Sequence, residues 1–84
     1  MITIESFKCS LKAAEDFINE IKDISMQYIA DELSSIEYYK EDLLNKYNEI
    51  INANINIAEF TERFELAIAN LTCFMNMATC NNQQ

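Results

Sequence analysis

The 84-residue chain contains no glycine and no proline, and this absence limits what it can fold into. Tight hairpin turns depend on glycine or asparagine at positive φ, and proline is common in reverse turns. A β-rich fold would need several such turns, whereas helices need only short polar connections. Half of the residues are hydrophobic, which is enough apolar material for one small core. We therefore predict an all-α fold and a single domain spanning residues 1–84.

Apolar residues recur every three or four positions along three stretches, which is typical of helices with one buried face. We expect helices at about 4–32, 35–53 and 57–79, folded as an antiparallel three-helix bundle, with 79–84 as a frayed polar tail. The first stripe is Ile4, Phe7, Leu11, Ala14, Ile18 and Ile21; the second is Met26, Ile29, Leu33, Ile36, Leu43, Tyr47 and Ile50, with Lys40 at its one polar position; the third is Ile57, Phe60, Phe64, Ala67, Leu71, Phe74 and Ala78.

The helix boundaries are less certain from the sequence than the stripes. Thr3 is expected to cap the first helix and Asn56 the last. Between the first two helices, Ser34 with Glu37 forms a capping-box pattern, and Asp23 is a competing cap. We favour a break near Ser34. A continuous helix is the third alternative, because apolar residues also repeat every eleven positions.

The end of the chain, from Leu66 to Gln84, carries no charge, although the chain as a whole is acidic. The third stripe accounts for only one face of the last helix. A helix that is apolar around so much of its circumference is either enclosed by its own fold or covered by another molecule. We predict a partner-binding or self-associating surface, the alternative being a helix deep in its own core. The apolar residues that the stripe leaves out are Leu66, Ile68, Cys73, Met75 and Met77.

Fourteen acidic residues against six basic ones give a net charge of −8. This charge disfavours direct contact with nucleic acid or an anionic membrane, and it favours a basic protein surface. The alternative is that the acidic residues form an ordinary solvated face. Four tyrosines are candidate anchors, since tyrosine is enriched at binding hot spots: Tyr28, Tyr38, Tyr39 and Tyr47. The predicted acidic and aromatic contact residues are Glu15, Asp16, Glu20, Asp23, Glu37, Tyr38, Tyr39, Glu41 and Asp42.

The chain has no histidine, so it lacks the commonest general base and metal ligand at neutral pH. The three cysteines do not suggest a disulfide framework, and we expect Cys9 to be a buried structural thiol. Cys73 and Cys80 are seven residues apart, which is not a zinc-binding spacing. We therefore predict no enzyme activity, no metal site and no cofactor.

A magnesium-dependent hydrolase is a distant alternative. All-α nucleotide pyrophosphohydrolases hold magnesium with an E-x-x-E pair followed by an E-x-x-D pair. Here the order is reversed, because Glu20 and Asp23 precede Glu59 and Glu62. Spacing alone does not supply the octahedral oxygen ligands that magnesium requires.

The sequence thus predicts a non-catalytic acidic helical protein that binds a protein partner with a basic surface or an apolar helix. An inhibitor or antidote of a basic or nucleic-acid-binding target, of the kind found in phages and mobile elements, is the first hypothesis. A small chaperone or a self-assembling subunit of a secretion or assembly system is the alternative, and a homodimer remains open. A cytoplasmic location is expected, since no leader or membrane-spanning pattern is recognised.

Overall fold

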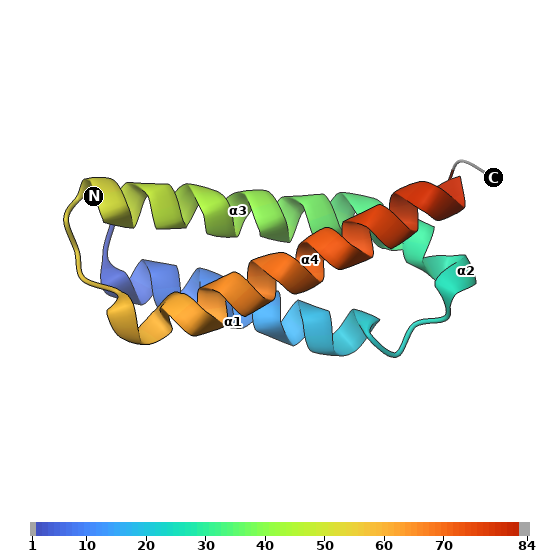
Figure 1. The fold of residues 1–84 in the computed structure, drawn as a ribbon, viewed down its shortest axis with the longest axis horizontal. Helices are drawn as coiled ribbons and strands as arrows, with labels where there is room; N and C mark the ends of the chain where they lie inside the picture. The colour runs from blue at the N-terminus through green and yellow to red at the C-terminus, as the bar shows by residue number, and fades with distance from the viewer. Residues whose placement is uncertain (1, 83–84) are drawn as a thin grey trace.

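The computed structural model describes residues 2–82, and within that range the chain forms helices and their connections without a strand. The three long helices are α1 (Ile4–Ile21), α3 (Leu33–Asn52) and α4 (Thr61–Asn82). Helices α1 and α4 run in the same direction, and α3, which lies between them in the sequence, runs in the opposite direction. This arrangement confirms the predicted antiparallel three-helix bundle (Figure 1). The bundle is elongated, with extents of 44 × 20 × 17 Å.

The first helix begins where the sequence predicts. The Thr3 side chain accepts a hydrogen bond from the backbone N–H of Ser6 at 3.1 Å, which satisfies one of the free donors of the first turn. The predicted stripe is buried apart from Ile4, which is partly buried, and Phe17 joins it on the side of the stripe.

The favoured break near Ser34 is wrong for the end of the first helix, because α1 already ends at Ile21. A helix continued in the same phase would place Ser25 and Glu32 on the buried face. The chain instead turns after Ile21, so that Ile24 packs against the core and Ile29 is enclosed. The break therefore lies near the competing position, Asp23.

Two short helical elements follow that break: α2 (Met26–Ile29) and the 3₁₀ turn η1 (Ala30–Glu32). Their N-cap positions and that of α3 lack side-chain caps, so neither Asp23 nor Ser34 acts as a cap. Tertiary packing of Ile29 stabilises this segment in place of capping. The side chain of Met26, a member of the second stripe, lies outside the described residues.

The connection from α3 to α4 relies on asparagine in place of glycine. Asn54 has a φ of 60°, the left-handed conformation that asparagine tolerates better than most residues. Its N–H donates to Ile51 O at 3.0 Å, and the N–H of Ile55 donates to Ile50 O at 3.1 Å, which together form a Schellman helix end. Asn56 then accepts a hydrogen bond from Ala58 N–H at 2.9 Å, as expected of a cap, and the 3₁₀ turn η2 (Ala58–Phe60) leads into α4.

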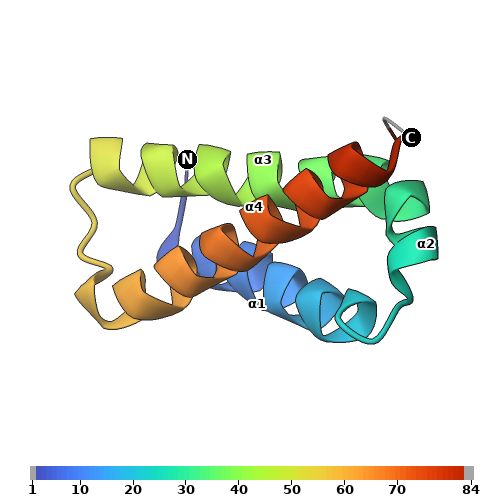
Figure 2. The same cartoon turned by 45° about the vertical axis from the view of Figure 1, so that its right-hand side comes forward.

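Helix α4 lies across the groove between the other two long helices. It begins beside α1 and ends beside α2, η1 and the start of α3 (Figures 1 and 2). Tyr47 of α3 stacks on Phe64 of α4 with ring centroids 4.1 Å apart, and Phe7 of α1 contacts both rings. The third stripe is buried except for Phe74, which is only half-buried, and α4 continues past residue 79 to Asn82. Gln83 and Gln84 lie outside the described residues.

Candidate functional site

The four tyrosines have different environments. Tyr47 stacks on Phe64 in the core, and Tyr39 stacks on Phe17 of α1 with centroids 4.5 Å apart, so both are half-buried. Tyr28 and Tyr38 are 55% and 62% exposed. The rings of Tyr38 and Tyr39 are in edge-to-face contact, with centroids 5.2 Å apart. Only Tyr28 and Tyr38 are therefore available to fill a pocket on another molecule.

Ion pairs engage only a minority of the acidic side chains. All fourteen acidic and six basic side chains lie within the described part of the chain, and four one-to-one pairs join them. Ten carboxylates and two lysines, Lys22 and Lys40, therefore have no oppositely charged partner within the bundle. The paired carboxylates are Glu5, Glu15, Asp16 and Asp42.

Six of the ten remaining carboxylates lie between the last turn of α1 and the middle of α3, on either side of the junction formed by α2 and η1. Lys22 and Lys40 are the basic residues there, so acidic groups outnumber basic ones three to one. Tyr28 and Tyr38 belong to the same end. We call this surface the acidic end, and it consists of Glu20, Asp23, Asp31, Glu32, Glu37, Glu41, Tyr28 and Tyr38.

The acidic end contains five of the predicted contact residues: Glu20, Asp23, Glu37, Tyr38 and Glu41. Asp31 and Glu32 are not among the predicted contact residues, because the predicted first helix includes them in its last turn; in the structure they lie in the 3₁₀ turn η1. The signal that could have indicated them is the loss of the first apolar stripe after Ile21, which places both residues in a connection rather than in a long helix. Three predicted residues, Glu15, Asp16 and Asp42, are held in ion pairs and are not counted with this surface.

The predicted apolar contact residues of α4 fall on two flanks of the helix. Ile68 and Met75 are seven residues apart, share one flank and are half-buried against the core. Leu66 and Cys73 share the opposite flank, since positions two apart on a helix differ by about 200°. Leu66 is 64% exposed and Cys73 is exposed, while Met77 beside them is half-buried. The fold therefore covers part of this apolar set and leaves Leu66 and Cys73 in solvent.

An uncharged row of side chains runs along this second flank of α4. Its members are spaced alternately four and three residues apart, which places them on one side of the helix. The thiol of Cys73 donates to Met77 Sδ at 3.9 Å within the row. We call it the α4 seam, and it consists of Leu66, Asn70, Cys73, Met77 and Cys80.

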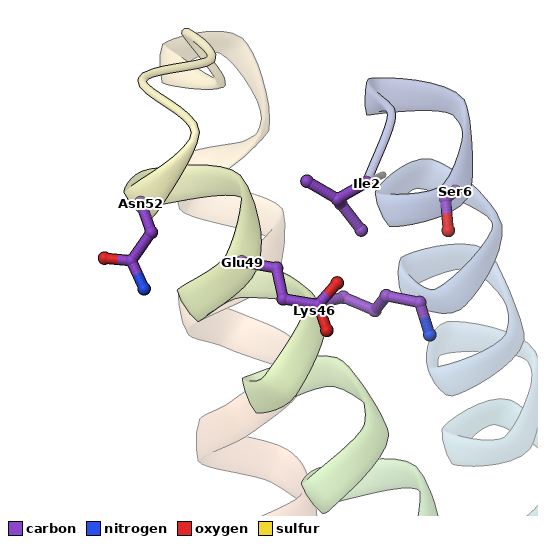
Figure 3. A pocket seen from close by; sticks show the side chains of 5 residues that line it. All are labelled: Ile2, Ser6, Lys46, Glu49 and Asn52. Carbon is purple, nitrogen blue, oxygen red and sulfur yellow. The ribbon is translucent and has the colours of Figure 1, made fainter.

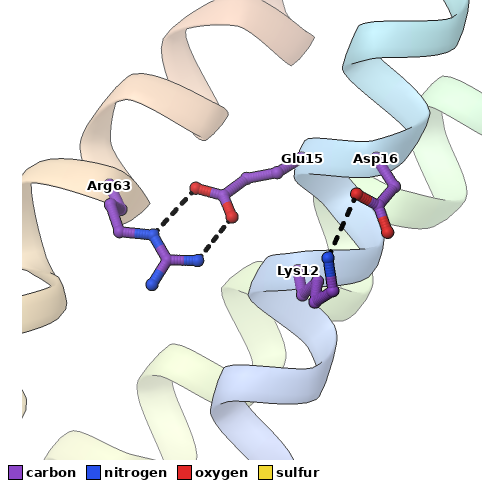
Figure 4. A network of polar contacts seen from close by, with 4 residues as sticks. All are labelled: Lys12, Glu15, Asp16 and Arg63. Atoms are coloured by element: carbon purple, nitrogen blue, oxygen red, sulfur yellow. Dashed lines mark hydrogen bonds and ion pairs between the residues drawn. The ribbon is translucent and has the colours of Figure 1, made fainter.

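A groove separates the start of the α4 seam from α1. It has a volume of about 400 Å³, and the buried side chains of Ile18 and Ala67 lie at its floor. Arg63 donates to both carboxylate oxygens of Glu15 across it, and Lys12 pairs with Asp16 along α1 (Figure 4). Each charge in the wall thus has an opposite charge beside it. The remaining lining residues are Asn19, Leu66 and Asn70.

The expectation that Cys9 is a buried thiol is wrong, because all three cysteines are exposed. Cys9 follows the buried Phe7 by two positions and therefore points away from the core. It lies instead in a shallow surface hollow with Glu5, Lys8, Lys12 and Arg63.

The two acidic pairs of the hydrolase alternative lie at different levels of the bundle. Arg63 lies beside Glu15, and α1 and α4 run in the same direction. Glu62 lies one residue before that level and Glu20 five residues after it, so about 9 Å of helix rise separates even the nearest members of the two pairs. No cluster of three or more potential metal-ligating side chains occurs in the described residues.

Another hollow lies at the opposite end of the bundle from α2, between Ile2 and Ser6 on one side and the end of α3 on the other. It has a volume of about 570 Å³ and a lining of mixed polarity (Figure 3). Lys46 reaches from α3 toward Ser6 of α1, and its ammonium pairs with Asp42 at 3.1 Å. Within the described residues the Lys46 ammonium is engaged by Asp42, and no hydrogen bond joins it to the Ser6 hydroxyl.

No protein-family model matches the chain, and searches of the curated proteins and of the solved structures also found no match. No helix between residues 2 and 82 has both the length and the apolar character needed to cross a bilayer. The acidic end combines charge with exposed aromatic rings, and the α4 seam is uncharged and partly apolar.

Proposed function

We propose that this protein is a non-catalytic, cytoplasmic binding protein whose acidic end docks on the basic surface of another protein. The observation that carries the proposal is the excess of unpaired carboxylates around two exposed tyrosines. This end contains six carboxylates and two lysines. None of the six carboxylates forms an ion pair with a basic residue of the bundle. A basic partner would neutralise them.

The two exposed tyrosines supply binding energy that charge alone does not provide. Carboxylates at a surface speed the encounter with a basic partner, but exposed ion pairs add little to affinity. Tyrosine rings bury a large apolar area and keep a hydroxyl for hydrogen bonding, so they often dominate binding energy. Tyr38 is well suited to this role because its ring contacts the ring of Tyr39, which in turn stacks on Phe17.

The target class that fits best is a protein whose own function requires a basic groove, such as a nucleic-acid-binding protein. Carboxylates arranged along helices can occupy such a groove in place of phosphates. Inhibitors and antidotes of this kind in phages and mobile elements share the small size and strong acidity of this chain. A chaperone or structural subunit is the second candidate, and the uncharged α4 seam is the observation that favours it.

The non-catalytic part of the proposal rests on geometry and on composition. The chain has no histidine, and its two acidic pairs lie at different levels of the bundle. A calorimetric titration with Mg²⁺ tests this point directly, because a magnesium-dependent hydrolase should bind the ion. We expect no saturable heat, and a tight, stoichiometric binding isotherm would contradict the proposal.

The test of the binding function compares two variants of equal charge. Glu37→Lys/Glu41→Lys changes the acidic end, and Glu59→Lys/Glu62→Lys makes the same charge change at the opposite end. Tagged wild-type protein and both variants are used to capture proteins from the native cell. We expect one basic protein to bind the wild type and the opposite-end variant and to be lost with the acidic-end variant.

Two further measurements complete the test. Tyr38→Ala should weaken the recovered complex about 10-fold or more, as expected for a hot-spot tyrosine. The association rate of the purified pair should fall as salt rises, because screening shortens the reach of the charges. Equal loss of the partner from both charge variants, or an association rate that does not depend on salt, would refute docking through the acidic end.

A further inference from the structure

Half of the acidic end is carried by the short connection between α1 and α3. Asp23, Tyr28, Asp31 and Glu32 all lie in this connection, in or beside α2 and η1. Neither element can hold itself in place, because α2 has four residues and η1 has three, and isolated helices of this length are unstable in water. The position of these side chains therefore depends on how the connection packs on the rest of the bundle.

Ile29 is the main attachment of the connection among the side chains that the structure describes. It is 1% exposed, and no other described side chain between Lys22 and Glu32 is buried. The N-cap positions of α2, η1 and α3 have no side-chain hydrogen bond, so capping does not fix the segment. The apolar contact of Ile29 with the core holds the connection instead.

Helix α4 provides the surface on which the connection packs. Its second half lies beside α2 and η1, and the helix carries no charge from Leu66 to Asn82 (Figure 1). Asp31 and Glu32 of η1 form no ion pair within the described residues. A carboxylate on this half of α4 would repel them, and its absence allows the two elements to pack together.

Repulsion between carboxylates opposes this packing. Five carboxylates without an ion pair lie in the connection or in the adjoining turns of α1 and α3: Glu20, Asp23, Asp31, Glu32 and Glu37. Like charges held near one another lower the stability of the arrangement. A basic molecule bound there would neutralise them, so its binding and the packing of Ile29 favour each other.

We propose that Ile29 is the positioning residue of the acidic end. Its packing beside α4 holds Tyr28, Asp31 and Glu32 in place against the repulsion of the carboxylates, and a basic partner strengthens that packing. The second part rests on the proposed function, whereas the first concerns the free protein. Loosening Ile29 should therefore weaken the partner complex, and the bound partner should suppress local opening of the connection.

Hydrogen exchange of the free protein tests the positioning role. Ile29→Ala should lower the protection of the amides of residues 24–32 about 10-fold or more relative to those in the middle of α1 and α3. Ile57→Ala is the matched control, because Ile57 is 4% exposed and lies in the connection at the other end of the bundle. Ile29→Val should keep most of the protection. Equal loss of protection at residues 24–32 in both alanine variants would overturn the role of Ile29.

Neutral substitutions test the repulsion. Asp31→Asn/Glu32→Gln removes two negative charges and should raise the protection of residues 24–32, and added salt should do the same in the wild type. Glu59→Gln/Glu62→Gln makes the same charge change at the opposite end and should leave these residues unchanged. Equal protection in the two variants would overturn the electrostatic part of the proposal.

An oligolysine peptide serves as the basic probe for the coupling. Ile29→Ala keeps every charge of the acidic end, so the peptide should associate at nearly the wild-type rate and dissociate about 5-fold faster or more. Ile57→Ala should alter neither rate, which separates positioning from a general loss of stability. Equal dissociation from the wild type and Ile29→Ala would overturn the coupling and leave the docking intact. Failure of the peptide to bind the wild type would contradict both the docking of a basic molecule and the coupling, and the exchange measurements would then decide the role of Ile29 in the free protein.

Discussion

Arg63 of α4 donates hydrogen bonds from Nε and Nη2 to the two carboxylate oxygens of Glu15 in α1, 48 residues earlier in the chain. The pair joins α4 to α1 across the groove between them (Figure 4). It also removes Glu15 from the carboxylates that remain free for another molecule. The hydrogen bonds that Arg63 donates to Glu15 raise the pKa of Arg63, whose guanidinium therefore stays protonated.

A double-mutant cycle with Arg63→Ala and Glu15→Ala should give a coupling free energy of about 0.5–1 kcal/mol, because both side chains remain partly exposed. The folded-state pKa of Arg63 is raised, so its contribution to stability is present below the unfolded-state pKa and lost only at higher pH. Raising the pH from about 7 to about 10 should therefore leave the contribution of Arg63 unchanged. Urea unfolding of the four proteins provides the measurement, and an additive double mutant would show that the pair contributes nothing.

Replacing Ile29 by alanine should lower the free energy of unfolding by about 2–5 kcal/mol. Ile29 is 1% exposed, and its helix α2 packs against α4, so the substitution leaves a cavity at that contact. The adjacent Tyr28→Ala should change stability by less than about 0.5 kcal/mol, since Tyr28 is exposed. Similar losses from both substitutions in chemical denaturation would show that α2 is not anchored through Ile29.

Asn54→Ala should destabilise the protein by about 1 kcal/mol, because alanine tolerates positive φ less well than asparagine. Asn54→Gly should be neutral or slightly stabilising, since glycine is the commonest residue at this position of a helix end. Asn52→Ala is the control, because Asn52 ends α3 within the helical region. Thermal unfolding of the three variants is sufficient, and an Asn54→Ala protein as stable as the glycine variant would argue against the turn.

Glu20→Lys and Glu62→Lys make the same charge change at opposite ends of helices. Glu20 lies in the last turn of α1, which has no basic residue, and Glu62 lies in the first turn of α4. The helix dipole favours cations at the first site and anions at the second, so Glu20→Lys should stabilise by about 0.3–1 kcal/mol relative to Glu62→Lys.

The difference between those two variants should shrink as salt is added, because both sites are exposed. Glu20→Lys should also weaken the proposed partner complex while it stabilises the bundle, since Glu20 belongs to the acidic end. Equal unfolding midpoints for the two variants at low salt would remove the dipole argument.

Most of the fold could be predicted from the spacing and hydrogen bonds of residues that are close together in the sequence. The apolar stripes of α1, α3 and α4 identified nearly all of the core, and Thr3 and Asn56 accept the backbone hydrogen bonds expected of them. The break after Ile21 was misplaced, because capping patterns near Ser34 outweighed the loss of the stripe in our interpretation. Packing of Ile29 decided the outcome, and that packing depends on α4, which is far away in the chain.

The candidate surfaces could be predicted by residue type but not by position. Composition indicated acidic and aromatic contacts, yet it could not show that Arg63 engages Glu15 or that Phe17 covers Tyr39. It also could not separate Ile68, which packs against the core, from Leu66, which does not.

The sequence by itself determined a helical bundle with three apolar faces and an excess of negative charge. These properties follow from the spacing of side chains along a helix and from hydrogen bonds between near neighbours, both of which are local. Only the tertiary structure decided which charges are paired, which tyrosines are exposed and which flank of α4 is open. Those outcomes depend on contacts between residues far apart in the chain, and the packing of the three helices sets them.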